Sequence, residues 1–238
     1  MGDRAYVQLR DALFAGRFEP GGNLPLRTLA ENFGTSITPV RDAVSRLVAQ
    51  GVLELGARNS ARVPEFGSDQ LSQLTIVRCE LEGLAAQEAV KASAPGLADA
   101  LAATLGEMRG LIRAGDFSRY LGVHRAFHFE IYAAAGVPLL QEMIENLWLR
   151  CGPVLSFVVP EYVTSLKGTD HHTAVVDAFR RGDGATARAE IVADIREASA
   201  FLLSLTDDTG TIRRRRAAEP PVEVPPFGDL AREDLPGA

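Results

Sequence analysis

Residues 24–53 read LPLRTLAENFGTSITPVRDAVSRLVAQGVL, and this stretch decides how the first part of the chain folds. The apolar spacing predicts a short helix at 26–33, which Gly34 closes. A second helix is expected from about residue 37 to residue 50, with proline in its first turn, where a missing N–H costs little. Two short helices joined by a tight turn predict a helix-turn-helix.

The flanking sequence extends this unit on both sides. Residues 4–16 have helical periodicity, and 52–55 and 61–63 resemble two short strands around a polar turn. Three helices followed by a hairpin is the order of a winged helix-turn-helix. Residues 1–66 are therefore expected to form a DNA-binding domain.

Four side chains of this region are candidates for DNA contacts. The start of a recognition helix enters the major groove, and here it carries Ser36, Thr38 and Arg41. Thr35 or Ser36 can also cap this helix. The two hydroxyls of Ser36 and Thr38 can reach phosphates or bases, and Arg41 can donate two hydrogen bonds to a guanine. Arg27 begins the preceding helix and can also reach DNA. The alternative for Arg41 is an ordinary solvated arginine.

The character of the sequence changes at about Ser68. Helical patterns dominate from there to residue 206, separated by turn residues near 93–95, 115–116, 136–138, 168–170 and 182–183. Six helices of ordinary length with short connections predict an antiparallel bundle for residues 67–206. The fold class is thus mainly α. The last segment, 207–238, is poor in aliphatic residues, holds five of the thirteen prolines and is expected to be disordered. Its arginine run, Arg213–Arg216, is either solvated or in contact with DNA phosphates.

Composition limits the setting of the protein. The chain has 238 residues, is 46% hydrophobic and carries a net charge of -6. Residues 1–66 hold eight arginines against seven acidic residues, so this part, at +1, is the less acidic and can still bind phosphates. No apolar run approaches the ~20 residues that span a bilayer. The charged N-terminus does not resemble a secretory signal, and Cys79 and Cys151 lack metal-type spacing, so a reduced, cytoplasmic protein without a membrane partner is expected.

The four histidines indicate a possible metal site. His124 and His128 are one helical turn apart on an otherwise apolar stripe, and His171 and His172 are adjacent. Asp194 shares a stripe with apolar residues, and a buried carboxylate requires a partner. Imidazoles that point into a helical core can begin a divalent metal site. The alternative is a set of hydrogen-bonded core histidines, and periodicity permits either His171 or His172 to face inward.

Residues 4–65 resemble the GntR family of bacterial transcription regulators. The match is carried by LPLRTLA at 24–30, by Ser36-x-Thr-Pro-Val-Arg-Asp-Ala to residue 43, by QGVL at 50–53 and by ARV at 61–63. The resemblance implies that Arg27, Thr38 and Arg41 contact operator DNA. Two positions depart from the family pattern. The family often has arginine at the position of Ile37, and it usually has glycine at the wing tip, where this chain has Ser60.

Residues 68–206 resemble the FCD domain of the FadR-type subfamily. The similarity is carried by RCELEGLA at 78–85, by His124-x-x-Phe-His128 and by His172 with the Gly-Asp pair at 182–183. Members with a full set bind a divalent metal through one Asp and three His, and the metal helps to hold a small carboxylate. The family has Asp at the first ligand position, where this chain has His124, and His at the last position, where this chain has Asp194. The first and last ligand types are thus exchanged, while His128 and His172 match the family. The family spacing selects His172 over His171.

The resemblance and the residues together predict a ligand-responsive regulator, not an enzyme, that binds operator DNA as a homodimer. A divalent ion (Zn, Ni or Mn) would help to hold a small carboxylate effector, and Arg78 could meet that carboxylate. The alternative for Arg78 is an interhelical salt bridge with an acid such as Glu82. A metal-free regulator with an acyl or other apolar ligand is the nearer alternative function. A metalloenzyme on a helical bundle is more distant, since no general base accompanies the proposed ligands.

Overall fold

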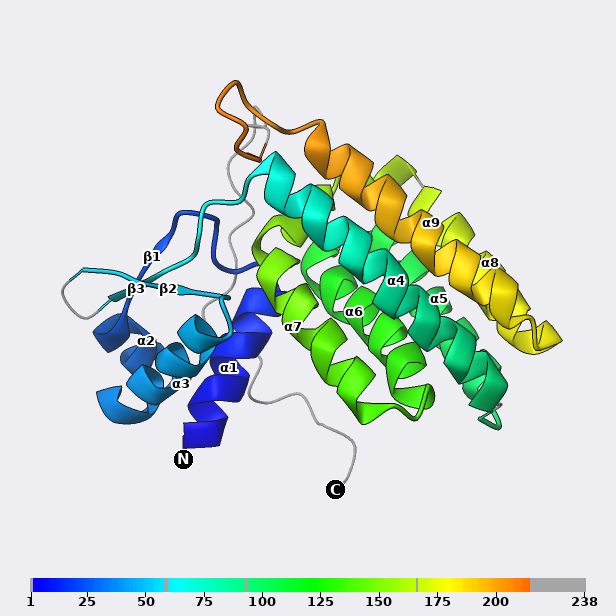
Figure 1. Ribbon diagram of the computed structural model, residues 1–238, viewed down its shortest axis with the longest axis horizontal. Coiled ribbons are helices and arrows are strands. Elements are labelled where there is room, and N and C mark those ends of the chain that lie inside the picture. Colours follow the sequence, from blue (N-terminus) through cyan, green and yellow to red (C-terminus); the bar gives the residue numbers. More distant parts are fainter. Residues whose placement is uncertain (1, 58–59, 93, 166, 215–238) are drawn as a thin grey trace.

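The computed structural model describes residues 2–57, 60–92, 94–165 and 167–214. It consists of a small N-terminal head and a larger helical bundle, which lie side by side (Figure 1). The elements of the head are α1 (Gly2–Phe14), β1 (Asn23–Pro25), α2 (Leu26–Asn32), α3 (Ile37–Ala49), β2 (Glu54–Leu55) and β3 (Ser60–Arg62). The expected order of three helices and a hairpin is confirmed.

The head differs from the expectation in one strand and in one cap. A third strand, β1, pairs antiparallel with β3, which lies between β1 and β2. Ser36 occupies the N-cap of α3, but its side chain makes no capping hydrogen bond. The apolar faces of the helices in the head are buried, including Leu9, Leu13 and Leu47 at 0% exposure, and they belong to a core that continues into the bundle.

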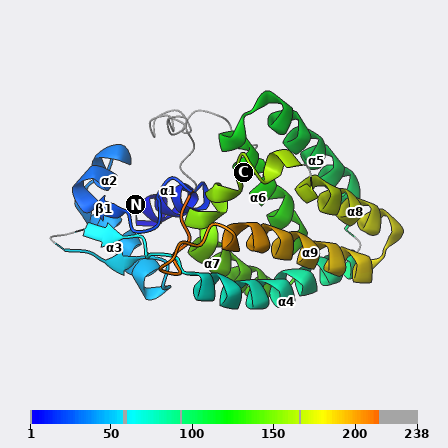
Figure 2. The ribbon, with the colours of Figure 1, turned by 90° about the horizontal axis from the view of Figure 1, so that it is seen from above.

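The described part of the bundle contains the six α-helices that the sequence predicts. They are α4 (Ser68–Ala92), α5 (Leu97–Ala114), α6 (Phe117–Ala134), α7 (Pro138–Leu155), α8 (Lys167–Arg181) and α9 (Gly184–Leu203). Two short 3-10 helices, η1 (Ser156–Val158) and η2 (Val163–Ser165), lie between α7 and α8. The long helices α4 and α9 run side by side, and α5, α6 and α8 complete the far side (Figures 1 and 2). Asp116 and Asp183 cap α6 and α9 through hydrogen bonds to backbone N–H groups.

The expectation of disorder from residue 207 onward is wrong for residues 207–214. Ile212 is 1% exposed, and its backbone N–H donates to the carbonyl oxygen of Phe66. Gly67 and Thr211 form an antiparallel bridge, as do Thr206 and Ile212. We call residues 205–214 the C-terminal clasp, because they hold the segment that links the head to α4. Residues 215–238, including Arg215 and Arg216, lie outside the described residues.

The head rests directly on α7 of the bundle. Gly152 permits this approach, because a Cβ at this position would lie 2.7 Å from the carbonyl oxygen of Leu13. At the far end of α3, the Arg150 guanidinium donates to the carbonyl oxygen of Gln50, and Arg10 of α1 pairs with Glu145. The two parts are therefore joined by packing and by polar contacts as well as by the linker.

Candidate metal centre and DNA-reading face

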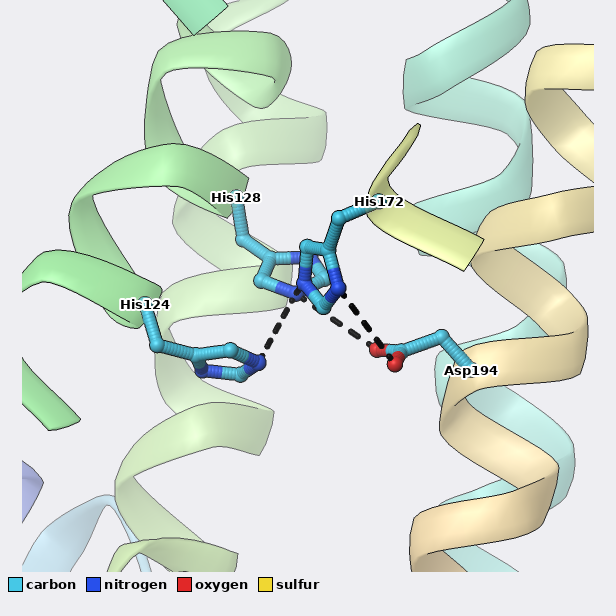
Figure 3. Close-up of side chains that lie close together, drawn as sticks. All are labelled: His124, His128, His172 and Asp194. Atoms are coloured by element: carbon cyan, nitrogen blue, oxygen red, sulfur yellow. Dashed lines mark hydrogen bonds and ion pairs between the residues drawn. The ribbon is translucent and has the colours of Figure 1, made fainter. Parts of the chain in front are cut away.

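Four side chains from three helices converge inside the bundle. His124 and His128 extend from α6, His172 from α8 and Asp194 from α9, and their rings and carboxylate face one another (Figure 3). The Nε2 atom of His128 lies 3.3 Å from Nε2 of His124 and 3.1 Å from Nε2 of His172. The Asp194 carboxylate lies 3.5 Å from His128 Nε2 and 3.9 Å from His172 Nδ1. One ligand atom from each residue falls within 4.8 Å of the others.

The two distances from His128 Nε2 to the other ring nitrogens suit a shared cation. Nitrogen ligands about 2.1 Å from one ion lie roughly 3.0–3.4 Å apart at angles near 90–110°. An unprotonated ring nitrogen has one lone pair, so His128 Nε2 can accept a hydrogen bond from only one of its two nitrogen neighbours, whereas a cation can be shared by all three nitrogens. The donor set, three imidazoles and one carboxylate, therefore fits a divalent transition metal.

A chain of hydrogen bonds fixes the tautomer of His128. The Tyr132 hydroxyl donates to Oε2 of Glu82, so its oxygen is free to accept from Nδ1–H of His128 at 3.0 Å. With the proton on Nδ1, Nε2 presents its lone pair to the cluster. Such outer hydrogen bonds orient metal-binding histidines.

Burial controls the charge of the cluster. Burial, with the neighbouring His172 and Arg78, holds the pKa of His124 well below its usual range. Burial likewise lowers the pKa of His128, with His124 and His172 adding to the effect. Burial raises the pKa of Asp194, and His172 opposes that rise. The imidazoles of His124 and His128 are thus neutral at pH 7, which is the form that binds metals.

His171 lies outside this cluster. Its Nδ1 atom is 2.7 Å from Glu190, and its Nε2 atom is 3.4 Å from Glu197. Partial burial alone would lower the pKa of His171, but the hydrogen bonds with Glu190 and Glu197 raise it. Of the two adjacent histidines, it is His172 that faces inward, as the family spacing implied.

Arg78, which was expected to contact an effector carboxylate, pairs in the structure with Glu82 of the same helix. Its Nε atom lies 2.6 Å from Oε1 of Glu82, and both side chains are buried. Burial alone would lower the pKa of Arg78, but Glu82 raises it, so the guanidinium stays charged. The pair lies within α4 and not between helices. The salt-bridge alternative is the one that the structure displays, although Arg78 also lines the cavity beside the cluster.

A cavity of about 50 Å³ adjoins the four side chains. Most of its lining is apolar. It includes residues that the sequence analysis did not single out, among them Phe14, Tyr120, Arg125, Leu155, Val158, Tyr162, Val163 and Ile195. No local signal in the sequence distinguishes a cavity wall from ordinary packing. Phe14 belongs to the head and Trp148, also in the lining, belongs to α7.

The four candidate DNA contacts share one part of the head. Arg27 lies at the start of α2, and Ser36, Thr38 and Arg41 lie at the start of α3, and all four are exposed. Ser60 is the first residue of β3, and its hydroxyl donates to the carbonyl oxygen of Ala57. The exposed start of α3 is the surface that a recognition helix presents to a major groove.

A winged helix-turn-helix joined to a helical bundle with a buried histidine–carboxylate cluster defines a DNA-binding protein with a second, all-helical domain. Residues 1–63 match the model of the bacterial regulatory proteins of the gntR family, and residues 73–197 match the FCD domain. The chain belongs to the GntR family, carries an FCD domain, and is a transcription regulator and not an enzyme. Regulators of this family bind operator DNA and small-molecule effectors. No helix in the described part of the chain is long and apolar enough to cross a membrane.

Known relatives support this assignment. The HTH-type transcriptional regulator McbR of Escherichia coli (strain K12) is 37% identical over 150 residues, which are 63% of this chain and 68% of McbR. The solved structure of E. coli McbR/YncC has a TM-score of 0.81 at 30% identity and covers 87% of this chain and 98% of that one. A GntR regulator structure from Rhodococcus sp. RHA1 shares the fold, with a TM-score of 0.70 at 18% identity over 85% of this chain and 97% of that one.

Proposed function

We propose that this regulator senses a small carboxylate through a divalent metal held by His124, His128, His172 and Asp194. It binds operator DNA as a homodimer, in the cytoplasm, where that DNA lies. The observation that carries the metal is the convergence of three ring nitrogens and one carboxylate within 4.8 Å. The hydrogen bond that leaves Nε2 of His128 unprotonated supports it.

The charge of the proposed centre favours an anionic effector. Three neutral imidazoles and one carboxylate around a divalent ion leave a net charge of about +1, which attracts a carboxylate at an open position. This ligand set suits zinc, nickel or manganese. The apolar lining of the cavity, with Leu155, Val158 and Val163, favours an acid whose body is apolar.

Metal analysis of the protein purified without an affinity tag tests the centre. We expect close to one divalent ion per chain, and we expect its loss in His128→Ala. His171→Ala is the matched control, because the neighbouring histidine pairs with Glu190 and Glu197. A wild-type protein that binds no zinc, nickel or manganese at neutral pH would contradict the proposal, as would equal loss in the two variants.

One observation favours a second candidate function. Because the cavity wall is mainly apolar, a metal-free regulator with an acyl or other apolar ligand remains the alternative. Treatment with a chelator separates the two. The metal-dependent sensor loses its response to a carboxylate when the ion is removed, whereas the metal-free regulator keeps its response.

The proposed homodimer is supported by exposed apolar side chains on α4 and α7, of which Val77, Leu139 and Met143 line one surface pocket. Ile76 is 67% exposed, Leu139 68% and Met143 47%, and Val77 and Leu84 are exposed on the same two helices. Apolar patches of this kind are typical of interaction sites. Two copies joined here would offer two recognition helices to two half-sites. Leu139→Glu should lower the sedimentation mass toward that of a monomer, while Leu55→Glu, in the wing, should not.

The residues that we propose to contact operator DNA are Arg27, Ser36, Thr38 and Arg41. Their common exposure near the start of α3 supports this role. Arg78 is the proposed effector contact from α4, although its pairing with Glu82 means that a carboxylate would have to share or displace that acid.

A further inference from the structure

One wall of the effector cavity belongs to the DNA-reading head. Phe14, the last residue of α1, lines the cavity together with His124, His128 and Asp194 of the bundle. Its side chain is 9% exposed, so the ring is enclosed by its neighbours. The helix that supports the recognition helix therefore touches the space where the effector is proposed to bind.

Phe14 contacts the residues that follow the two histidines of α6. The Arg125 guanidinium lies over its ring, with Cζ 4.6 Å from the ring centroid, and Phe129 meets it edge-on at 6.0 Å between centroids. Arg125 follows His124 directly, and Phe129 follows His128. A shift of α6 that brings the histidines onto a ligand also moves both neighbours against Phe14.

A polar contact strengthens the same junction. Arg125 also pairs with Asp11 of α1, with Nη1 3.5 Å from Oδ1, and Arg125 itself lines the cavity. An anion in the cavity therefore competes with Asp11 for a guanidinium that is already committed to the head. Phe14 and Arg125 are part of both the cavity and the head–bundle junction.

On its other side, α1 is fixed to the recognition helix. The Tyr6 hydroxyl donates to the side chain of Gln50, and the Arg46 guanidinium of α3 lies 3.9 Å from the Tyr6 ring centroid. Leu9 of α1 and Leu47 of α3 belong to the same buried apolar core. A rotation of α1 thus carries α3 with it.

We propose that Phe14 and Arg125 transmit occupancy of the cavity to the DNA-reading head. This inference rests on the proposed function only in that the cavity binds the effector. Coupling between two sites is reciprocal, so DNA bound at the head must change the cavity in turn. The effect can therefore be measured before the effector is identified.

The single tryptophan of the chain reports on the cavity. Trp148 lines it, lies 5.4 Å from Phe129 between ring centroids and is 3% exposed. The experiment titrates the full chain with a duplex that the wild-type protein has selected from a random-sequence pool, and follows Trp148 emission. We expect a saturable change whose midpoint equals that of DNA binding measured by anisotropy. A duplex of random sequence should give a smaller change.

Two substitutions make the test specific. Phe14→Leu should lose most of the change in Trp148 emission at saturating duplex. Phe33→Leu is the control, because it removes another buried phenylalanine ring of the head that does not line the cavity, and it should keep the change in emission. An unchanged emission in the wild type would overturn the inference, and so would an unchanged response in Phe14→Leu. If Phe14→Leu does not fold, Arg125→Lys takes its place, because it keeps the charge but not the planar contact with the ring. Loss of the Trp148 response would support the inference, and an unchanged response would overturn it.

Failure of this inference is distinct from failure of the proposed function. A protein that holds a metal but shows no Trp148 response to DNA retains the proposed centre and loses the proposed transmission. A protein without metal whose Trp148 responds through Phe14 retains the transmission and loses the metal.

Discussion

Arg78 and Glu82 form an ion pair inside the bundle, one turn apart on α4, with 2.6 Å between Nε and Oε1. Glu82 is 0% exposed and also accepts a hydrogen bond from Tyr132. Removing one member of a buried pair leaves the other charged and unpartnered, which costs about 3–5 kcal/mol. We therefore expect Glu82→Gln to lower the free energy of unfolding by this amount in denaturant titrations. Glu88→Gln, which breaks an exposed pair with Lys91 on the same helix, should cost about 0–1 kcal/mol.

The exchanged ligands of the proposed centre predict a rescue. His124→Asp alone gives two carboxylates and two imidazoles, a harder site that should favour manganese over zinc. Asp194→Ala should weaken binding, because it removes the only anionic ligand. The double exchange, His124→Asp with Asp194→His, should recover most of the zinc affinity lost in the singles. Competition with a chromophoric chelator measures all four proteins. Equal affinity of Asp194→Ala and wild type would show that this carboxylate is not a ligand.

Arg41 is expected to read a base. Arg41→Ala should weaken binding to a selected duplex by about 1–3 kcal/mol and relax the preference at one base pair. Arg113→Ala, an exposed arginine of α5, removes the same charge far from the recognition helix and serves as the control. Equal losses on selected and random duplexes would instead make Arg41 a phosphate contact.

The C-terminal clasp should contribute to stability. Truncation after Leu205 removes Ile212 from its buried site beside Phe66, and burial of one such side chain stabilises by about 1.5–3 kcal/mol. Thermal and denaturant unfolding should therefore show this difference from a chain truncated after Arg214. Identical midpoints for the two truncated chains would mean that the clasp does not hold in solution.

The clasp should also respond to acid. The Thr209 hydroxyl and the backbone N–H groups of Thr211 and Thr209 hold the pKa of Asp207 at about 2, below its ordinary value of 3.8. A lowered folded-state pKa stabilises the fold above the ordinary value, and this contribution disappears as the pH falls through about 2. The difference in unfolding free energy between wild type and Asp207→Asn should shrink over this range. Asp208→Asn, which removes the same charge at the neighbouring position, is the matched control.

The sequence predicted the elements whose signals are local. Helical periodicity and the turn glycines located the six bundle helices, and family spacing selected His172 over His171. β1 was missed because three residues, one of them proline, carry no strand pattern, and its pairing depends on β3 some 40 positions later. The clasp was missed because composition cannot reveal one buried isoleucine or the set of hydrogen bonds that the Asp207 carboxylate accepts. Phe14 was expected only as part of a helix in the head, since a contact between two domains leaves no trace in local spacing.

The bridge between Gly67 and Thr211 means that the chain leaves the bundle where it entered. Proteins are synthesised from the N-terminus, and domains generally fold as units. The head is therefore complete on the ribosome well before Ile212 emerges to hold the linker at Phe66. During that interval a nascent chain carries its DNA-reading surface without a clasp to restrain the linker. During synthesis the DNA-reading head is therefore complete before residues 205–214 can hold the linker between the head and α4.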